Sequence, residues 1–133
     1  MENLNFKMPD QEADEIISNI LHNVSEIMLV KAKEYVREED RMHNFNRASF
    51  LSGKTREECL DGFRLKHIIS SKDIINDINE KQNLPSIELV DEKYTDIINY
   101  YILEYMSVIN KINNIKKIQN EQKNCSSQKK AVR

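Results

Sequence analysis

The 133-residue chain has little glycine, proline and cysteine, with two residues of each, and it has no tryptophan. Turns and hairpins draw on glycine for positive φ and on proline for a fixed φ, so this scarcity favours long helices. Cys59 and Cys125 lie far apart in the sequence and make neither a disulfide framework nor a zinc-binding pattern. The simple prediction is a reduced, cytoplasmic protein.

Long apolar runs are also missing. No uninterrupted apolar stretch approaches the length of a membrane span, and the N-terminal MENLNFKMPDQEADE lacks the basic and apolar regions of a secretory signal. We therefore expect a protein that is neither exported nor inserted into a membrane. Only 39% of the residues are apolar and 32% are charged. A single domain of this length must therefore build its core economically.

The net charge of −2 is unevenly distributed. Residues 116–133 carry six basic side chains against one glutamate, a net +5, which leaves −7 for residues 1–115. An acidic body argues against a nucleic-acid groove, so nucleic acid is not expected as a partner. The basic C-terminal segment either binds polyanions weakly or is only a disordered, solubilising tail. We expect the disordered tail to cover residues 119–133.

At the other end of the chain, residues 1–9 are expected to be a flexible N-terminus.

Four helical segments are predicted from apolar periodicity and from start and stop signals. They cover about 10–36, 42–52, 55–80 and 87–118. Gly53 is placed to end the second segment, and Thr55 begins a capping box, TREE, that opens the third. Pro85 separates the third from the fourth, because proline disfavours helical geometry at the preceding residue.

The fourth segment is apolar at so many positions between Val90 and Ile115 that these fill an arc wider than one stripe. An arc that wide needs cover on more than one side. The sequence therefore predicts an all-α fold over residues 10–118, a helical bundle of three long helices plus one short helix. We expect dimerisation to complete it, most simply as a symmetric homodimer.

Polar residues interrupt the apolar faces of the last two segments. They are Lys66, Ser70, Asp73 and Asp77 beside an inward-facing His67 on the third, and Glu92, Asp96 and Asn99 on the fourth. Steps of three and four residues place each set along one helix face. Two facing helices would then each project a row of carboxylates. A divalent cation such as Mg²⁺ would relieve their repulsion, because it binds hard oxygen ligands together with substrate phosphates.

These residues allow two interpretations. The four carboxylates are candidate Mg²⁺ ligands, yet Asp and Glu at such spacing are also ordinary on solvated helix faces. His67 is either a catalytic side chain or a hydrogen-bonded core histidine. Asn99 is a candidate substrate-binding residue, because it stands among apolar residues and its amide needs hydrogen-bond partners if it is buried.

Four strings within residues 31–105 carry a family resemblance: KAKEY, DRMHNFNRAS, GFRLKHIISSKDIINDI and DEKYTDIINYYILEY. They resemble small, mostly phage-encoded proteins akin to the MazG-like all-α nucleoside triphosphate pyrophosphohydrolases. The resemblance implies a helical bundle, assembled as a dimer or tetramer, in which acidic side chains from two helices bind Mg²⁺. In that family the metal activates water to cut a nucleoside triphosphate into monophosphate and pyrophosphate.

The same resemblance places Glu92 and Asp96 at the second acidic motif of the family, and Asp73 with Asp77 at the first. The sequence departs from the family pattern at both motifs. Two aspartates four residues apart replace a tight Glu-x-x-Glu pair, and Lys93 occupies a usually acidic position.

The stretch EYVREEDRMHNFNRASF, residues 34–50, is interpreted as the lip of the site. Arg41, Asn44 and Arg47 would then contact substrate, with arginine donating to phosphate oxygens. The alternative is an ordinary connector in which the two arginines pair with the glutamates of the EED run.

The sequence thus predicts a Mg²⁺-dependent nucleoside triphosphate pyrophosphohydrolase. Lys66, Arg41 and His67 would stabilise charge that develops on the phosphate chain. The alternative, favoured by Lys93 and the missing glutamates, is a catalytically degenerate helical module that binds a nucleotide or a protein partner.

Overall fold

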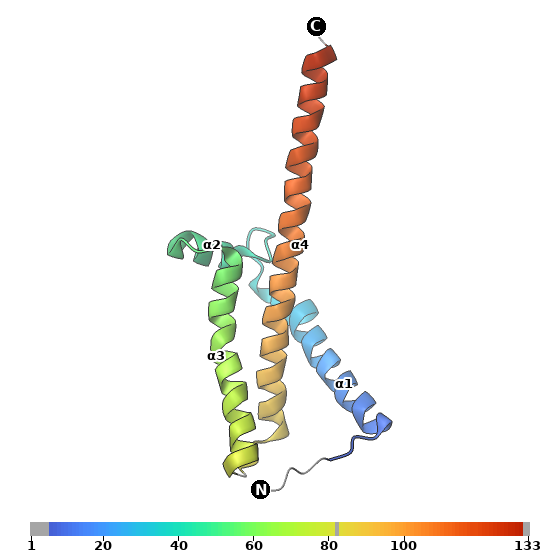
Figure 1. Ribbon diagram of the computed structural model, residues 1–133, viewed down its shortest axis with the longest axis vertical. Coiled ribbons are helices and arrows are strands. Elements are labelled where there is room, and N and C mark those ends of the chain that lie inside the picture. The colour runs from blue at the N-terminus through green and yellow to red at the C-terminus, as the bar shows by residue number, and fades with distance from the viewer. Residues whose placement is uncertain (1–5, 82, 132–133) are drawn as a thin grey trace.

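The computed structural model describes residues 6–81 and 83–131, which form helices joined by short connectors (Figure 1). The helical elements are α1 (Asp10–Ser25), the π-helix η1 (Glu26–Val30), the 3₁₀-helix η2 (Lys31–Tyr35), α2 (His43–Ser52), α3 (Arg56–Asn76), the π-helix η3 (Asp77–Lys81) and α4 (Ile87–Ala131). An isolated bridge between Arg37 and Asp40 is the one β-type pairing in these residues. The predicted all-α bundle of three long helices and one short helix is confirmed.

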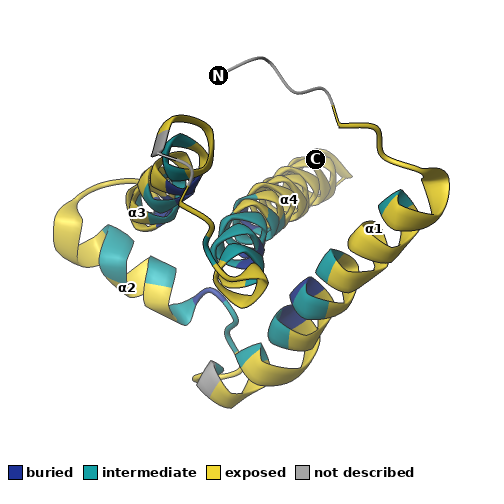
Figure 2. Cartoon of the chain, turned by 90° about the horizontal axis from the view of Figure 1, so that it is seen from below, coloured by how far each residue is buried: buried dark blue, intermediate teal, exposed yellow. Residues whose placement is uncertain are grey.

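The central helix of the bundle is α4. Both α1 and α3 pack against it, and α2 packs against α3. Figure 2 shows α4 between α1 and α3, with α2 crossing one side of the bundle. Beyond these contacts α4 continues alone toward its C-terminal end, as Figure 1 shows. None of the described helices is both long and apolar enough to cross a membrane.

The core is small, as the low apolar content predicts. Its buried apolar residues are Val24, Met28, Met42, Leu60 and Ile74. Leu60 is fully buried, whereas Phe63, three residues further along α3, remains 44% exposed. Much apolar surface on α1, α3 and α4 is therefore left in contact with solvent.

Local signals place several helix boundaries correctly. The Thr55 hydroxyl accepts a hydrogen bond from the Glu58 backbone N–H at 3.1 Å, as the capping box predicts for the N-terminus of α3. Gly53 ends α2 with a left-handed φ of 69°. Residues 83–86 separate η3 from α4, in agreement with the break predicted at Pro85.

Two boundaries differ from the prediction. The first segment is regular α-helix only to Ser25, after which it becomes π-helical and then 3₁₀-helical. The last helix continues to Ala131 instead of ending near residue 118, so residues 119–131 are helical although a disordered tail was expected there. The extension is understandable because no glycine or proline follows Pro85 to end the helix.

A polar network, buried at Arg56 and Ser107, joins α3 to α4. Arg56 donates from Nε to the Ser107 hydroxyl at 2.6 Å and from Nη2 to the Ser107 carbonyl at 3.1 Å and to Asn110 Oδ1 at 3.0 Å. Ser107 in turn donates to Glu57 at 2.8 Å, and Lys111 donates to the other oxygen of that carboxylate at 2.5 Å. Because these contacts are directional, they set the antiparallel register of the two helices.

Candidate functional site

Two adjoining cavities lie between α4 on one side and α1 with its π-helical and 3₁₀ continuation on the other. The first, which we call the aromatic cavity, has a volume of about 280 Å³. It is lined by Ile27, Met28, Lys31, Ala32, Val36, Asp40, Arg41, His43, Asn44, Phe45, Asp96, Asn99, Tyr100 and Leu103. The second, which we call the acidic cavity, has a volume of about 200 Å³. It is lined by His22, Asn23, Glu26, Ile27, Lys31, Asp91, Glu92, Thr95 and Asp96.

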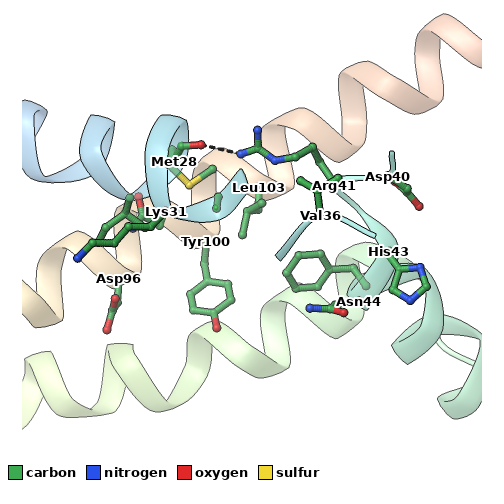
Figure 3. Close-up of a pocket in the computed structure, with 14 residues that line it drawn as sticks. Met28, Lys31, Val36, Asp40, Arg41, His43, Asn44, Asp96, Tyr100 and Leu103 are labelled. Atoms are coloured by element: carbon green, nitrogen blue, oxygen red, sulfur yellow. Dashed lines mark hydrogen bonds between the residues drawn. The ribbon is translucent and has the colours of Figure 1, made fainter. Parts of the chain in front are cut away.

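The connector after η2 closes one wall of the aromatic cavity. Glu38 and Glu39 adopt left-handed φ angles of 54° and 58°, which turn the chain sharply. The turn brings Arg41 back toward η1, where its Nη2 donates to the Met28 carbonyl at 2.6 Å (Figure 3). The bond ties the connector to the π-helix, a type of helix that is frequent at functional sites.

Aromatic rings extend from the aromatic cavity to the α3–α4 interface. Phe45 packs edge-on against Phe63 at 6.0 Å between ring centroids, and Phe63 stacks on Tyr100 at 6.4 Å. His67 lies 5.4 Å from the Tyr100 ring. Since Phe45 and Tyr100 also line the aromatic cavity, this packing holds two ring faces in place there.

Asn99 on α4 is buried in the wall of the aromatic cavity, with 6% of its surface exposed. Its Oδ1 has no hydrogen-bond partner among the described residues. The same is true of the hydroxyl of Thr95, which is 2% exposed and lines the acidic cavity. A buried polar group without a partner costs about 1–3 kcal/mol. Each cavity therefore has a buried polar group that a bound ligand or ordered water would satisfy.

Asp96 lies where the two cavities meet, and it lines both, as does Lys31. Figure 3 shows these two side chains at the same end of the aromatic cavity, away from Asp40 and His43. The Asp96 Oδ2 is 3.5 Å from Nδ1 of His67 on α3. Burial raises the pKa of the Tyr100 phenol above its usual value of 10.0, and the charge of Asp96 raises it further. Tyr100 therefore stays protonated and can donate a hydrogen bond.

Several predicted site residues come together here. Arg41, Asn44, Asp96 and Asn99 line the aromatic cavity, and Glu92 joins Asp96 around the acidic cavity. The connector interpretation required Arg41 to pair with a neighbouring glutamate, but its hydrogen bond goes to the Met28 carbonyl instead.

Other predicted site residues lie outside both cavities. Arg47 is exposed, with its guanidinium 5.7 Å from the centroid of the Phe50 ring. Lys66 is exposed on α3. His67 reaches the site only through its contact with Asp96.

The structure does not bring together the four predicted metal ligands. Asp73 and Asp77 line neither cavity, whereas Asp96 lines both and Glu92 lines the acidic one. Within residues 6–81 and 83–131, no three His, Cys, Asp or Glu side chains are grouped closely enough to hold one ion.

Sequence reasoning missed several lining residues, namely Glu26, Lys31, Asp40, His43, Asp91, Thr95 and Tyr100. Lys31 begins the KAKEY string and Tyr100 lies in DEKYTDIINYYILEY, so both were inside the segments that carry the family resemblance. Glu26 and Asp91 come from two helices whose packing the periodicity did not predict. No local signal in the sequence marks them.

Comparisons with protein-family models, with curated proteins and with solved structures found no match to this chain. The chemistry of the site therefore rests on its own geometry. An aromatic cavity with amide and cationic groups adjoins an acidic cavity. Such a pair suits a ligand that has a flat ring system at one end and an anionic, metal-binding group at the other.

Proposed function

We propose that the chain binds a nucleoside triphosphate and hydrolyses it to the monophosphate and pyrophosphate, with Mg²⁺ as cofactor. The observation that supports this proposal is the pair of adjoining cavities that share Lys31 and Asp96. One cavity offers ring faces and amides for a base, and the other offers carboxylates for a metal–phosphate group. A nucleoside triphosphate has both parts in one molecule.

In the aromatic cavity the base would lie against Phe45 and Tyr100. Stacking of a base on an aromatic ring contributes about 1–3 kcal/mol. The Asn99 amide offers a donor and an acceptor at the same wall, and its Oδ1 is unpaired among the described residues. A base edge would therefore satisfy a buried group that has no partner in the free protein.

Lys31 and Arg41 would bind the phosphate chain. Lys31 lines both cavities and brings a compact positive charge to the point where base and phosphates would separate. Arg41 has one nitrogen bound to the Met28 carbonyl, which orients the remaining N–H groups of its planar guanidinium.

The acidic cavity fits a Mg²⁺ ion that arrives with its nucleotide. Glu26, Asp91, Glu92 and Asp96 supply carboxylate oxygens around it. Mg²⁺ commonly takes only one or two carboxylates plus waters and substrate phosphates, so a preformed group of three ligands is not required. When bound, the ion neutralises phosphate charge and lowers the pKa of a coordinated water. His67, whose Nδ1 is 3.5 Å from Asp96 Oδ2, would hold this carboxylate in position beside the ion.

A second candidate is nucleotide binding without hydrolysis. The specific observation in its favour is the lack of any close group of three acidic or histidine ligands in the described part of the chain. Lys93, which stands beside the acidic residues of α4, would weaken a metal site further. In this version the helical module would bind a nucleotide, or a protein partner, with the same cavities and no turnover.

Pyrophosphate release from a panel of nucleoside and deoxynucleoside triphosphates, with and without Mg²⁺, tests the proposal. We expect release only with Mg²⁺. Asp96→Asn should lower the rate by on the order of 100-fold, the usual scale for removing one electrostatic group. Asp14→Asn is the matched control, because Asp14 is exposed on α1 and lines neither cavity.

Thermal unfolding with each nucleotide separates the two candidates. Stabilisation by a nucleotide without pyrophosphate release would select the binding module. If no nucleotide either stabilises the protein or is hydrolysed, nucleotide binding is wrong in both candidates, and only the protein-binding form of the second candidate is left.

We also propose that the protein works as a homodimer in the cytoplasm. The exposed apolar surface left by the small core supports association. Cys59 and Cys125 are both free, which agrees with a reducing compartment.

A further inference from the structure

One face of α4 carries apolar side chains at a regular spacing, and most of them are exposed. Ile98, Tyr101, Tyr105, Val108, Ile112 and Ile115 follow one another at alternating steps of three and four residues. The last five are 50%, 66%, 42%, 43% and 54% exposed, in that order. Alternating steps of three and four are typical of helices that pair as coiled coils. We call these six residues the α4 seam.

Most of the α4 seam faces away from the rest of the bundle, and Tyr101 lies at its edge, in contact with Arg64 of α3. The buried residues of α4 are Thr95, Asn99 and Ser107. At 3.6 residues per turn, Asn99 and Ser107 lie about 120–160° around the helix from Tyr105 and Ile112, and Thr95 lies about 80–100° from them. A partner on the seam would therefore leave the contacts of α1 and α3 with α4 intact.

We propose that a second copy of this chain covers the α4 seam, with the two α4 helices antiparallel about a two-fold axis beside residues 106 and 107. In this alignment Tyr105 of one copy meets Val108 of the other, and Tyr101 meets Ile112. Both pairs place a large ring against a branched aliphatic side chain. Tyr101 is already fixed for such a contact, since the Arg64 guanidinium lies 4.1 Å from its ring centroid.

Charges beside the seam favour the antiparallel arrangement. The antiparallel arrangement places Glu104 of one copy next to Lys111 of the other, and Glu88 next to Lys123. Because of the two-fold axis, each of these pairs occurs twice in the dimer. Glu104 and Lys111 are already oriented by ion pairs with α3. A parallel pair would instead put Lys111 next to Lys116 of the second copy, and like charges at such positions disfavour pairing.

The charge distribution along the whole of α4 agrees. Residues 87–97 contain four acidic side chains and one lysine, whereas residues 116–131 contain five lysines and one glutamate. Antiparallel helices place the acidic end of each copy beside the basic end of the other. Parallel helices would place like ends together, at separations within the Debye length of physiological salt. The basic end of α4 thus has an acidic partner in a second copy.

Sedimentation equilibrium of the full chain tests the association. We expect a dimer for the wild-type protein and a monomer for Val108→Lys, which would bury a charge in the seam. Leu51→Lys is the matched control, because Leu51 is an exposed apolar residue on α2 outside the seam, and it should remain dimeric. A wild-type monomer, or a Val108→Lys protein that stays dimeric, would overturn the proposal.

Cysteine cross-linking tests the direction of the helices, on a background with Cys59→Ser and Cys125→Ser. Tyr101→Cys combined with Ile112→Cys should form an intermolecular disulfide. Ile112→Cys alone should not, because an antiparallel pair separates the two 112 positions by about 16 Å along the axis, beyond disulfide reach. Cross-linking of the single variant, or no cross-linking of the double variant, would overturn the proposal. These results do not depend on nucleotide hydrolysis, and they decide the question even if Val108→Lys does not fold.

Discussion

Arg56 and Ser107, 51 positions apart in the sequence, are joined by two hydrogen bonds between α3 and α4. The guanidinium donates both to the hydroxyl and to the carbonyl of Ser107, at 2.6 and 3.1 Å, and Arg56 is only 8% exposed. Both residues are buried where an apolar pair would be expected. The contact therefore specifies which positions of the two helices face each other, as well as holding the helices together.

Arg56→Ala should destabilise the protein by about 3 kcal/mol, since it leaves the acceptors of Ser107 and Asn110 buried without donors. Urea denaturation monitored by circular dichroism measures the change. Arg47→Ala is the matched control, because Arg47 is exposed over Phe50. It should cost less than about 0.5 kcal/mol. Equal losses in the two variants would contradict the structural role of Arg56.

Glu57 makes stability depend on acid pH. Burial raises the pKa of this carboxyl, but hydrogen bonds from Lys111 and Ser107 outweigh burial and lower the pKa from 4.5 to about 2. The stabilisation is therefore present above pH 4.5 and is lost as the pH falls from 4.5 through about 2. Glu57→Gln should flatten the slope of unfolding free energy against pH in this range. An unchanged slope would show that carboxylates other than Glu57 cause the pH dependence of the unfolding free energy.

Replacing each of the two glycines by alanine should change the stability of the protein in opposite directions. Gly53 has a φ of 69°, so Gly53→Ala should cost about 1 kcal/mol because L-residues are strained there. Gly62 lies inside α3, and a methyl group at its Cβ position would meet nothing within 4 Å. Gly62→Ala should therefore stabilise the protein by about 0.5 kcal/mol through higher helix propensity. Thermal unfolding of the two variants checks the signs.

Asn99→Leu should separate stability from ligand binding. Removing an amide whose Oδ1 is buried and unpaired should raise the unfolding free energy by about 1 kcal/mol. The same change should abolish the thermal shift produced by a nucleotide, because the base loses its hydrogen-bonding partner. Asn114→Leu is the control, since Asn114 is exposed on α4 and lies outside both cavities. A nucleotide shift that survives Asn99→Leu would place the base elsewhere.

Asp73→Asn discriminates between the metal ligands expected from the sequence and those that line the acidic cavity. Asp73 lines neither cavity, so its loss should change pyrophosphate release less than twofold, whereas Glu92→Gln should lower it by at least about tenfold. Comparable losses for the two variants would favour the α3–α4 site that the sequence predicts.

Helix boundaries that depend on local chemistry were predictable from the sequence. Thr55, Gly53 and Pro85 each act within three or four residues, and all three lie at the boundaries they predict. The change from α- to π-helix at Glu26 was not predictable, because it accompanies tertiary contacts such as the bond of Arg41 to the Met28 carbonyl. Apolar spacing alone did not reveal it.

The candidate site was predictable only in part, for a related reason. Spacing identifies the face of a helix on which Asp96 and Asn99 lie, but it does not identify the helix that packs against that face. The sequence suggested α3 as the source of the opposing carboxylates, whereas the cavities open toward α1. Lys31 and Glu26 became candidates only when the packing was known.

The length of α4 separates its C-terminal end from the aromatic cavity. At 1.5 Å per residue, Ala131 stands about 42 Å along the helix axis from Leu103, which lines the aromatic cavity. A fluorophore or affinity tag attached at that end is therefore remote from a ligand in the cavity of the same copy. Energy transfer between a labelled nucleotide and a dye on the last turn of α4 would therefore report whether the aromatic cavity is occupied. The dye would not disturb the residues that line this cavity.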